Sequence, residues 1–123
     1  MVVRPFATIM ELPERFIEVV RGCESLPPEV RSHAHESIAI EESRFDESYI
    51  EFLDTQIQLS PRGPDWTARL QQRREELRPY CGVTLVHGVV PVGSSHFSIY
   101  TIPEQRAVVH WEEYDYPYPS EAV

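Results

Sequence analysis

The chain contains no lysine and no asparagine, so all eleven of its basic side chains are arginines. It also has no apolar run close to the roughly 20 residues that a membrane-spanning helix needs. Its first residues offer neither a long apolar segment nor a small-residue cleavage site, so no secretory signal is expected. These absences predict a soluble protein that stays in the cytoplasm.

The common catalytic and cofactor-binding motifs are missing as well. The sequence has no phosphate-binding glycine loop, no HExxH, no GxSxG and no zinc-finger spacing. Its two cysteines, Cys23 and Cys81, form no CxxC pair. In a cytoplasmic chain we expect both to be reduced thiols, with a disulfide as the alternative. The sequence therefore assigns no catalytic residue, no metal ligand and no cofactor, and it favours a non-enzymatic protein.

The charge is strongly acidic and unevenly distributed. Net charge is −9, with twelve acidic residues against five arginines in residues 1–61. Residues 62–78 reverse this balance, with five arginines against three acids. An acidic surface repels nucleic acid and anionic membranes and attracts basic proteins. The alternative is that the charge serves solubility alone.

Residues 82–113 read as three apolar runs divided by two short turns. In the first turn, residues 90–93 have the sequence VPVG, which predicts a three-residue loop with a glycine bulge. This loop would pair Val90 with Ser94, and therefore His87 with Phe97. Residues 102–105 form the second turn. Strands joined this tightly are antiparallel, so we predict a three-stranded meander.

Alternation along these strands predicts the two faces of the meander. Phe97, Ile99, Val109 and Trp111 would share the buried face. With the predicted turn, His87 falls on that buried face too. The opposite face would carry four polar side chains: His96, Tyr100, His110 and Glu112. These four could form an acid–base site, or simply a solvated sheet surface.

Other segments are predicted from turn and helix signals. Residues 6–10 read as a short strand, and residues 13–21 as an amphipathic helix that ends at Gly22. Residues 66–78 read as a helix that begins near Asp65 and ends at Pro79. Its apolar stripe is narrow and bordered by arginines, which could lie along the seam or form an anion-binding patch. Residues 29–60 are ambiguous: we expect strands near 37–45 and 49–59, with one long helix as the alternative.

Together these segments predict an α+β fold. It would consist of an antiparallel sheet, including the C-terminal meander 82–113, with two or three helices packed on one face. Residues 1–113 would form a single α+β domain. Residues 114–123 alternate tyrosine and proline and add acidic residues, so they would form an extended tail.

One partial family resemblance involves histidines. His33 and His35 are two residues apart, and His96 closes the sequence PVGSSH. This set resembles the two half-motifs of cupins, small β-barrels that hold a metal with HxH, a glutamate and a later histidine. The resemblance would imply metal binding by His33, His35 and His96. However, the glycine before the first histidines is missing, Glu41 lies one residue out of place, and a predicted helix interrupts the strands.

The function predicted from these patterns is protein binding. The chain would be a small acidic module, an inhibitor or bacterial immunity-type partner of a basic toxin or enzyme that acts by occlusion. Tyrosines would anchor the partner and carboxylates would attract it. The alternatives are a small-molecule or metal site on the sheet, and a subunit of a larger assembly such as a homodimer. The expected partner-binding residues are Trp66, Arg69, Arg73, His96, Tyr100, His110, Glu112, Glu113, Tyr114, Asp115, Tyr116 and Tyr118.

Overall fold

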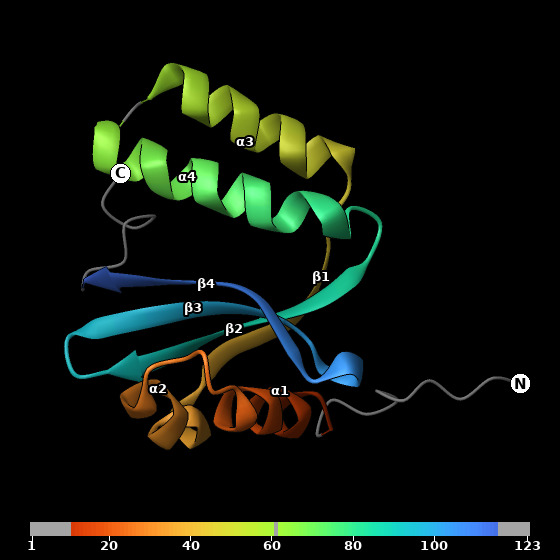
Figure 1. Ribbon diagram of the computed structural model, residues 1–123, viewed down its shortest axis with the longest axis vertical. Coiled ribbons are helices and arrows are strands. Elements are labelled where there is room, and N and C mark those ends of the chain that lie inside the picture. Colours follow the sequence, from red (N-terminus) through yellow and green to blue (C-terminus); the bar gives the residue numbers. More distant parts are fainter. Residues whose placement is uncertain (1–10, 61, 116–123) are drawn as a thin grey trace, which may run out of the picture. The chain divides into compact units, whose positions relative to one another are not determined.

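The fold is α+β, as the sequence predicts. The computed structural model describes residues 11–60 and 62–115 (Figure 1). The helices are α1 (Glu11–Gly22), α2 (Pro28–Ser32), α3 (Glu47–Leu59) and α4 (Pro64–Leu77), with short 3-10 turns η1 (Ala34–Glu36), η2 (Arg78–Tyr80) and η3 (Pro103–Gln105). The strands β1 (Ile38–Arg44), β2 (Thr84–Val92), β3 (Ser95–Ile102) and β4 (Ala107–Asp115) form one antiparallel sheet in the order β1-β2-β3-β4. None of the helices in these ranges has the length and apolar character that crossing a membrane requires.

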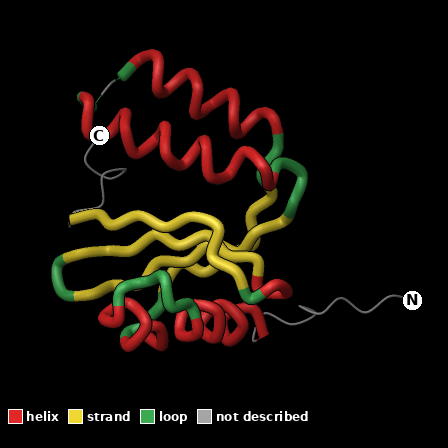
Figure 2. The backbone as a smooth tube through the Cα atoms, viewed as in Figure 1, coloured by secondary structure: helices red, strands yellow, loops and turns green. Residues whose placement is uncertain are grey.

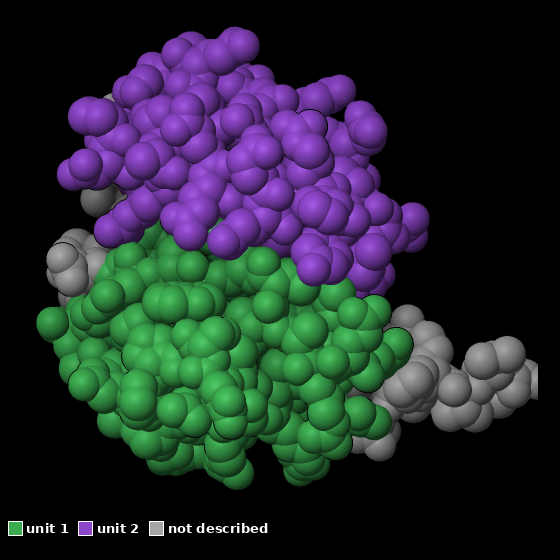
Figure 3. Space-filling view, in the orientation of Figure 1, with its two compact units in different colours: residues 1–42, 86–123 green, residues 43–85 purple. Residues whose placement is uncertain are grey.

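The chain forms two compact units (Figure 3). Unit 1 comprises residues 1–42 and 86–123, and unit 2 comprises residues 43–85. Unit 1 therefore holds α1, α2 and most of the sheet. Unit 2 holds α3 and α4.

In unit 1, α1 and α2 pack on one face of the sheet. Phe16 and Val20 are four residues apart on α1 and both are fully buried, as is Val30 of α2. They share one core cluster with Leu26, Ala34, Val86, Val90, Phe97 and Ile99. Trp111 and Val108 of β4 pack against that cluster. The predicted burial of Phe97 and Ile99 on a common face is confirmed, and Trp111 is partly buried against the same cluster. The prediction for Val109 is wrong, because Val108 is the β4 valine that packs there.

The hairpin between β2 and β3 differs from the predicted one. Val92 pairs with Ser95, so the loop contains only Gly93 and Ser94. Gly93 has φ +62°, which suits the first central position of a two-residue turn that starts with glycine. Pro91 lies inside β2 rather than in the turn. The predicted pairing of Val90 with Ser94 is therefore wrong.

Because the observed register differs from the predicted one, the side chains of β2 lie on the opposite faces from those predicted. Val90 pairs with Phe97, and His87 pairs with Tyr100 instead of Phe97. A shift by an odd number of positions moves every side chain of one strand to the other face. His87 therefore lies on the same face as Tyr100 and His110. The prediction that His87 is separated from His110 is wrong.

The second half of the meander matches the prediction more closely. β3 and β4 are antiparallel, and η3 with Arg106 at φ +51° joins them. The register shifts by one residue after the Tyr100–His110 pair, which marks a bulge in β4. β4 continues through Tyr114 to Asp115, so it includes the first two residues of the predicted tail.

Residues 29–60 combine one correct and one wrong prediction. The strand near 37–45 is confirmed as β1, but the segment predicted as a strand over 49–59 is the helix α3 (Figure 2). Asp46 caps this helix by accepting hydrogen bonds from the backbone N–H groups of Ser48 and Tyr49. Ile50 and Leu53 then form its buried side, at helical spacing. The alternation of Thr55, Ile57 and Leu59 suggested a strand. The Asp46 cap and the burial of Ile50 and Leu53 stabilise a helix instead.

In unit 2, α3 and α4 lie side by side as a helical pair (Figure 1). α4 begins two residues earlier than predicted, with Asp65 in its first turn, and ends at Leu77. Leu70 and Leu77 form its buried side. The Arg74 Nη1 atom lies 2.7 Å from Asp54 Oδ1 on α3. One of the arginines beside the apolar stripe is thus used to join the two helices.

Two predictions fall on residues outside the described ranges. These are the short strand at 6–10 and the tail beyond Asp115, including Tyr116 and Tyr118.

Candidate functional site

The sheet face opposite α1 and α2 carries a row of three rings from three strands. His87 pairs with Tyr100, and Tyr100 pairs with His110, so the three residues follow one another across β2, β3 and β4. The His87 and Tyr100 rings are stacked, with centroids 4.4 Å apart and 19° between their planes. The Tyr100 and His110 rings are tilted, with centroids 5.7 Å apart. The row depends on the observed register of the β2–β3 hairpin, which pairs His87 with Tyr100.

A second set of polar groups lies beside the row. His87 Nε2 and Ser98 Oγ are 2.6 Å apart, within hydrogen-bond distance. His110 Nε2 lies 3.7 Å from Glu112 Oε2, a distance that permits an ion pair when the imidazole is protonated. The Tyr114 hydroxyl donates a hydrogen bond to Glu112 Oε1. These contacts connect histidine, serine, carboxylate and phenol groups on one face, here called the polar cluster: His87, Ser98, Tyr100, His110, Glu112 and Tyr114.

Most of the polar cluster is buried. Ser98 and Tyr114 are each 1% exposed, and His110 is 2% exposed. Tyr100 and Glu112 are also buried, and only His87 is half-buried. Burying such groups is costly unless they are hydrogen-bonded, which explains why their contacts are internal. The interpretation of this face as a solvated sheet surface is therefore wrong.

The polar cluster contains the groups that proton transfer needs, but its serine is inaccessible. A serine hydroxyl at hydrogen-bond distance from an imidazole is the arrangement of an activated nucleophile. A histidine next to a carboxylate can exchange protons near neutral pH. A substrate would have to reach Ser98, which is 1% exposed. In this conformation the cluster works as an internal polar network.

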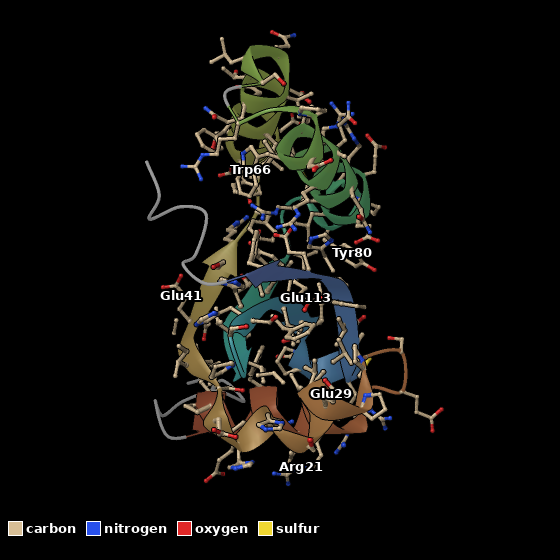
Figure 4. All side chains as sticks on the ribbon, turned by 90° about the vertical axis from the view of Figure 1, so that its left-hand side faces the viewer. Arg21, Glu29, Glu41, Trp66, Tyr80 and Glu113 are labelled. Atoms are coloured by element: carbon tan, nitrogen blue, oxygen red, sulfur yellow. The ribbon has the colours of Figure 1, made fainter. Side chains whose placement is uncertain are left out.

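The other predicted partner-binding residues lie in different surroundings. Glu113 on β4 is exposed (Figure 4). His96 is half-buried on the same face as the polar cluster, where it pairs with Tyr114. On α4, Trp66, Arg69 and Arg73 are half-buried, and the guanidinium carbon of Arg62 lies 5.3 Å from the Trp66 ring centroid. Asp115 ends β4, and its side chain is outside the described atoms.

The histidines of the cupin-like motif are on helical turns. His33 follows α2 and His35 lies in η1, whereas the cupin motif needs a strand. His33 Nδ1 is 2.7 Å from the Glu29 carbonyl oxygen, a contact within its own helical turn. Each of the two histidines has its Nε2 atom 3.8 Å from Glu36 Oε2. In residues 11–60 and 62–115, no three His, Cys, Asp or Glu side chains are grouped to hold a metal ion. The helical position of His33 and His35 argues against the cupin resemblance.

The charge imbalance belongs mainly to unit 1. That unit contains thirteen acidic residues and five arginines, whereas unit 2 contains seven acidic residues and six arginines. Among the described residues of unit 1, Arg21 and Arg106 are the only exposed arginines. Nine glutamates of that unit are exposed: Glu14, Glu18, Glu24, Glu29, Glu36, Glu41, Glu42, Glu104 and Glu113. Unit 1 therefore presents an acidic surface.

Sequence reasoning missed two members of the polar cluster, His87 and Ser98. The signal for them was present in the turn, because a glycine–serine pair between two apolar runs is typical of a two-residue hairpin. The prediction placed Pro91 inside the turn, and this placement gave the wrong register. The burial of the cluster had no comparable signal, since polar side chains on one sheet face usually indicate exposure.

No protein-family model, curated protein or solved structure matches this chain. Its function has therefore to be inferred from its own residues.

Proposed function

We propose that this chain is an acidic protein-binding module whose partner is a basic protein, of the inhibitor or immunity type. The observation that supports this proposal is the acidic surface of unit 1, whose described side chains include nine exposed glutamates against two exposed arginines. Such a field raises the encounter rate with a positively charged partner and disfavours anionic ones. Binding would inhibit the partner by covering its basic, functional surface.

Only side chains that are exposed can touch a partner, so exposure selects the proposed contact residues. Glu113 on β4 remains a proposed contact, together with exposed carboxylates such as Glu41 and Glu42 on β1, the strand at the other edge of the sheet. Tyr116 and Tyr118 remain proposed anchors from the sequence pattern. Tyr100, His110, Glu112 and Tyr114 are buried, so they would support the sheet rather than touch the partner.

The test is affinity capture with a charge-neutralised variant. Wild-type protein and the triple variant Glu41→Gln, Glu42→Gln, Glu113→Gln would be immobilised and exposed to extract from the source cells. Quantitative mass spectrometry should show a basic protein that is retained by the wild type and depleted several-fold on the variant. An acidic retained protein, or equal retention by both forms, would contradict the proposal.

A second candidate function rests on the polar cluster. The convergence of His87, Ser98, His110 and Glu112 would suit a small polar ligand or a proton-transfer reaction, if the cluster opens. Native mass spectrometry of gently purified protein is the direct test. A stoichiometric mass increment that is lost in the variant His87→Gln would favour this function. Retention of the increment in that variant, or its absence from the wild type, would argue against it.

A further inference from the structure

Helix α3 exposes two large apolar side chains on one side. Phe52 is 55% exposed and Leu59 is 68% exposed. They are seven residues apart, which is about two helical turns, so they lie on the same side of the helix about 10 Å apart along its axis. Thr55, between them on that side, is also exposed. Only one other large apolar residue among the described ones, Ile38 on β1, is comparably exposed.

Phe52 and Leu59 are not needed for the pairing of α3 with α4. The buried side of α3 consists of Ile50 and Leu53, the latter fully inaccessible. The ion pair between Asp54 and Arg74 adds a polar contact between the helices. Toward the start of α3 lies the half-buried Tyr49, whose ring stacks on Phe45 at 4.7 Å between centroids and lies 6.4 Å from the ring of Phe52. An apolar stripe of Tyr49, Phe52 and Leu59 is thus left on α3 in addition to its buried side.

The charged side chains of α3 itself have one sign, and the exposed Arg44 lies just before the helix, close enough to Asp46 to act on its carboxylate. Residues 45–60 contain four acids, Asp46, Glu47, Glu51 and Asp54, and no arginine. Glu47 and Glu51 are exposed and four residues apart, so they form a row along one border of the stripe. Asp54 is engaged by Arg74. The border of the stripe therefore attracts cations.

We propose that the stripe of Tyr49, Phe52 and Leu59 is the docking site for a basic amphipathic helix of the partner protein. This inference rests on the proposed function and adds a contact surface in unit 2 to the carboxylates proposed in unit 1. The partner helix would place apolar residues at i, i+3 or i+4 and i+7 over Phe52 and Leu59, and a Lys or Arg beside Glu47 and Glu51. Exposed single apolar residues are common on protein surfaces, but two on one side of a helix, near the exposed Glu47 and Glu51, offer both the apolar anchors and the charge that a basic amphipathic helix would use.

Charge complementarity favours this occupant over a second copy of the chain. A second α3 would bring the same four acids and no base in residues 45–60. The whole chain carries −9, so two copies repel at long range. A basic helix would be attracted both by the acids of residues 45–60 and by the net negative charge of the whole chain. A homodimer through α3 is the outcome that would replace this proposal.

The experiment uses a synthetic helical peptide of about 18 residues, long enough to cover the stripe, with leucines on one side and lysines on both borders. Fluorescence anisotropy would measure its binding to the full chain. The double variant Phe52→Gln, Leu59→Gln should weaken binding at least about tenfold, because two large apolar anchors are lost. Glutamine is a good helix former, so α3 should persist, and circular dichroism would check this. The variant Glu47→Gln, Glu51→Gln should also weaken binding, and it should reduce the salt dependence.

The matched control is Ile38→Thr, which removes the exposed apolar residue of β1 and should change binding less than about twofold, as expected for a residue outside the contact. Equal binding by the wild type and the Phe52/Leu59 variant would overturn the proposal, as would no binding by the wild type. A wild-type dimer in light scattering that dissociates in the Phe52/Leu59 variant would overturn it in favour of a second copy.

The same variants separate this inference from the proposed function. If the basic protein captured by the wild type is still retained by the Phe52/Leu59 variant, the partner binds elsewhere and only the α3 site fails. If every variant retains the captured protein and binds the peptide as well as the wild type does, both the α3 site and the proposed function are contradicted.

Discussion

At the scale of single residues, the packing of unit 1 depends on one glycine. Gly88 of β2 lies on the face that α1 covers, and it pairs with Ile99. A Cβ atom built on Gly88 would come within 2.6 Å of Phe16 Cζ. The Phe16 ring is fully buried, so it has no free space into which to shift. The absence of a side chain at residue 88 is therefore what lets α1 approach the sheet.

We accordingly expect Gly88→Ala to destabilise the protein by about 1–3 kcal/mol, the usual cost of overpacking a well-filled core. Urea unfolding followed by circular dichroism would measure the change in the free energy of unfolding. The matched control is Gly22→Ala at the end of α1, where nothing lies within 4 Å of the added Cβ. A loss of stability as large in the control as at Gly88 would contradict the steric explanation.

The hairpin register is decided at the residue scale as well. Gly93, not Pro91, sets the turn, and the odd shift between the two alternatives determines which face His87 occupies. The sequence contains both turn signals, Pro91 and Gly93, and the pairing of β2 with β3 decides which of them lies in the turn. For this reason the common face of Phe97, Ile99 and Trp111 was predictable, and so was that of Tyr100, His110 and Glu112, whereas the position of His87 beside Tyr100 was not.

At the scale of elements, α3 shows why a clear local pattern can mislead. Residues 55–59 alternate as a strand would, yet the segment begins with a helix cap. Asp46 Oδ1 accepts hydrogen bonds from Ser48 Oγ at 2.6 Å and from the Ser48 and Tyr49 backbone N–H groups at 3.1 and 3.3 Å. The hydrogen bond from the Ser48 side chain, followed by that from the Tyr49 backbone, holds the pKa of Asp46 below its usual value of 3.8.

This cap leads to a prediction with a defined pH dependence. Asp46→Ala should lower the free energy of unfolding, because the first N–H groups of α3 lose their acceptor. Asp46→Asn should retain most of the capping but lose the titration. Since the folded-state pKa of Asp46 is lowered, the carboxylate's extra stabilisation is complete above the ordinary pKa of 3.8 and is lost as the pH falls through the lower folded-state value.

Urea unfolding of the wild type and both variants between about pH 2.5 and pH 7 would test this, because that range spans the ordinary pKa of an aspartate. The stability difference between wild type and Asp46→Asn should shrink below about pH 4, near that ordinary pKa. A difference that stays constant over the whole range would show that the carboxylate charge does not contribute.

At the scale of the whole molecule, charge is the property that most restricts the partner. The sequence pI is about 4.9, so the chain is anionic at neutral pH. Most of the excess lies in unit 1, and unit 2 is nearly balanced. Within unit 2, residues 45–60 carry four acids and no arginine, whereas α4 carries three arginines and three acids. The other arginines of the unit, Arg44, Arg62 and Arg78, lie outside the two helices.

Raising the ionic strength should therefore slow association with the basic peptide more than it speeds dissociation. Between about 0.05 and 0.5 M salt we expect the association rate constant to fall about tenfold or more, because the Debye length falls well below 10 Å. Stopped-flow fluorescence would measure both rates. An association rate constant that does not depend on salt would show that long-range attraction plays no part in recognition.

The sequence by itself determined the α+β class, the antiparallel meander and the helices α1 and α4, because these follow from local patterns of turns, caps and apolar spacing. It also determined the net charge, and with it the kind of partner proposed here. Only the tertiary structure decided the pairing of His87 with Tyr100, the burial of His110 and Glu112, and the exposure of Phe52 and Leu59. The physical reason is that register and burial depend on which segments meet in space, and distant residues supply that information.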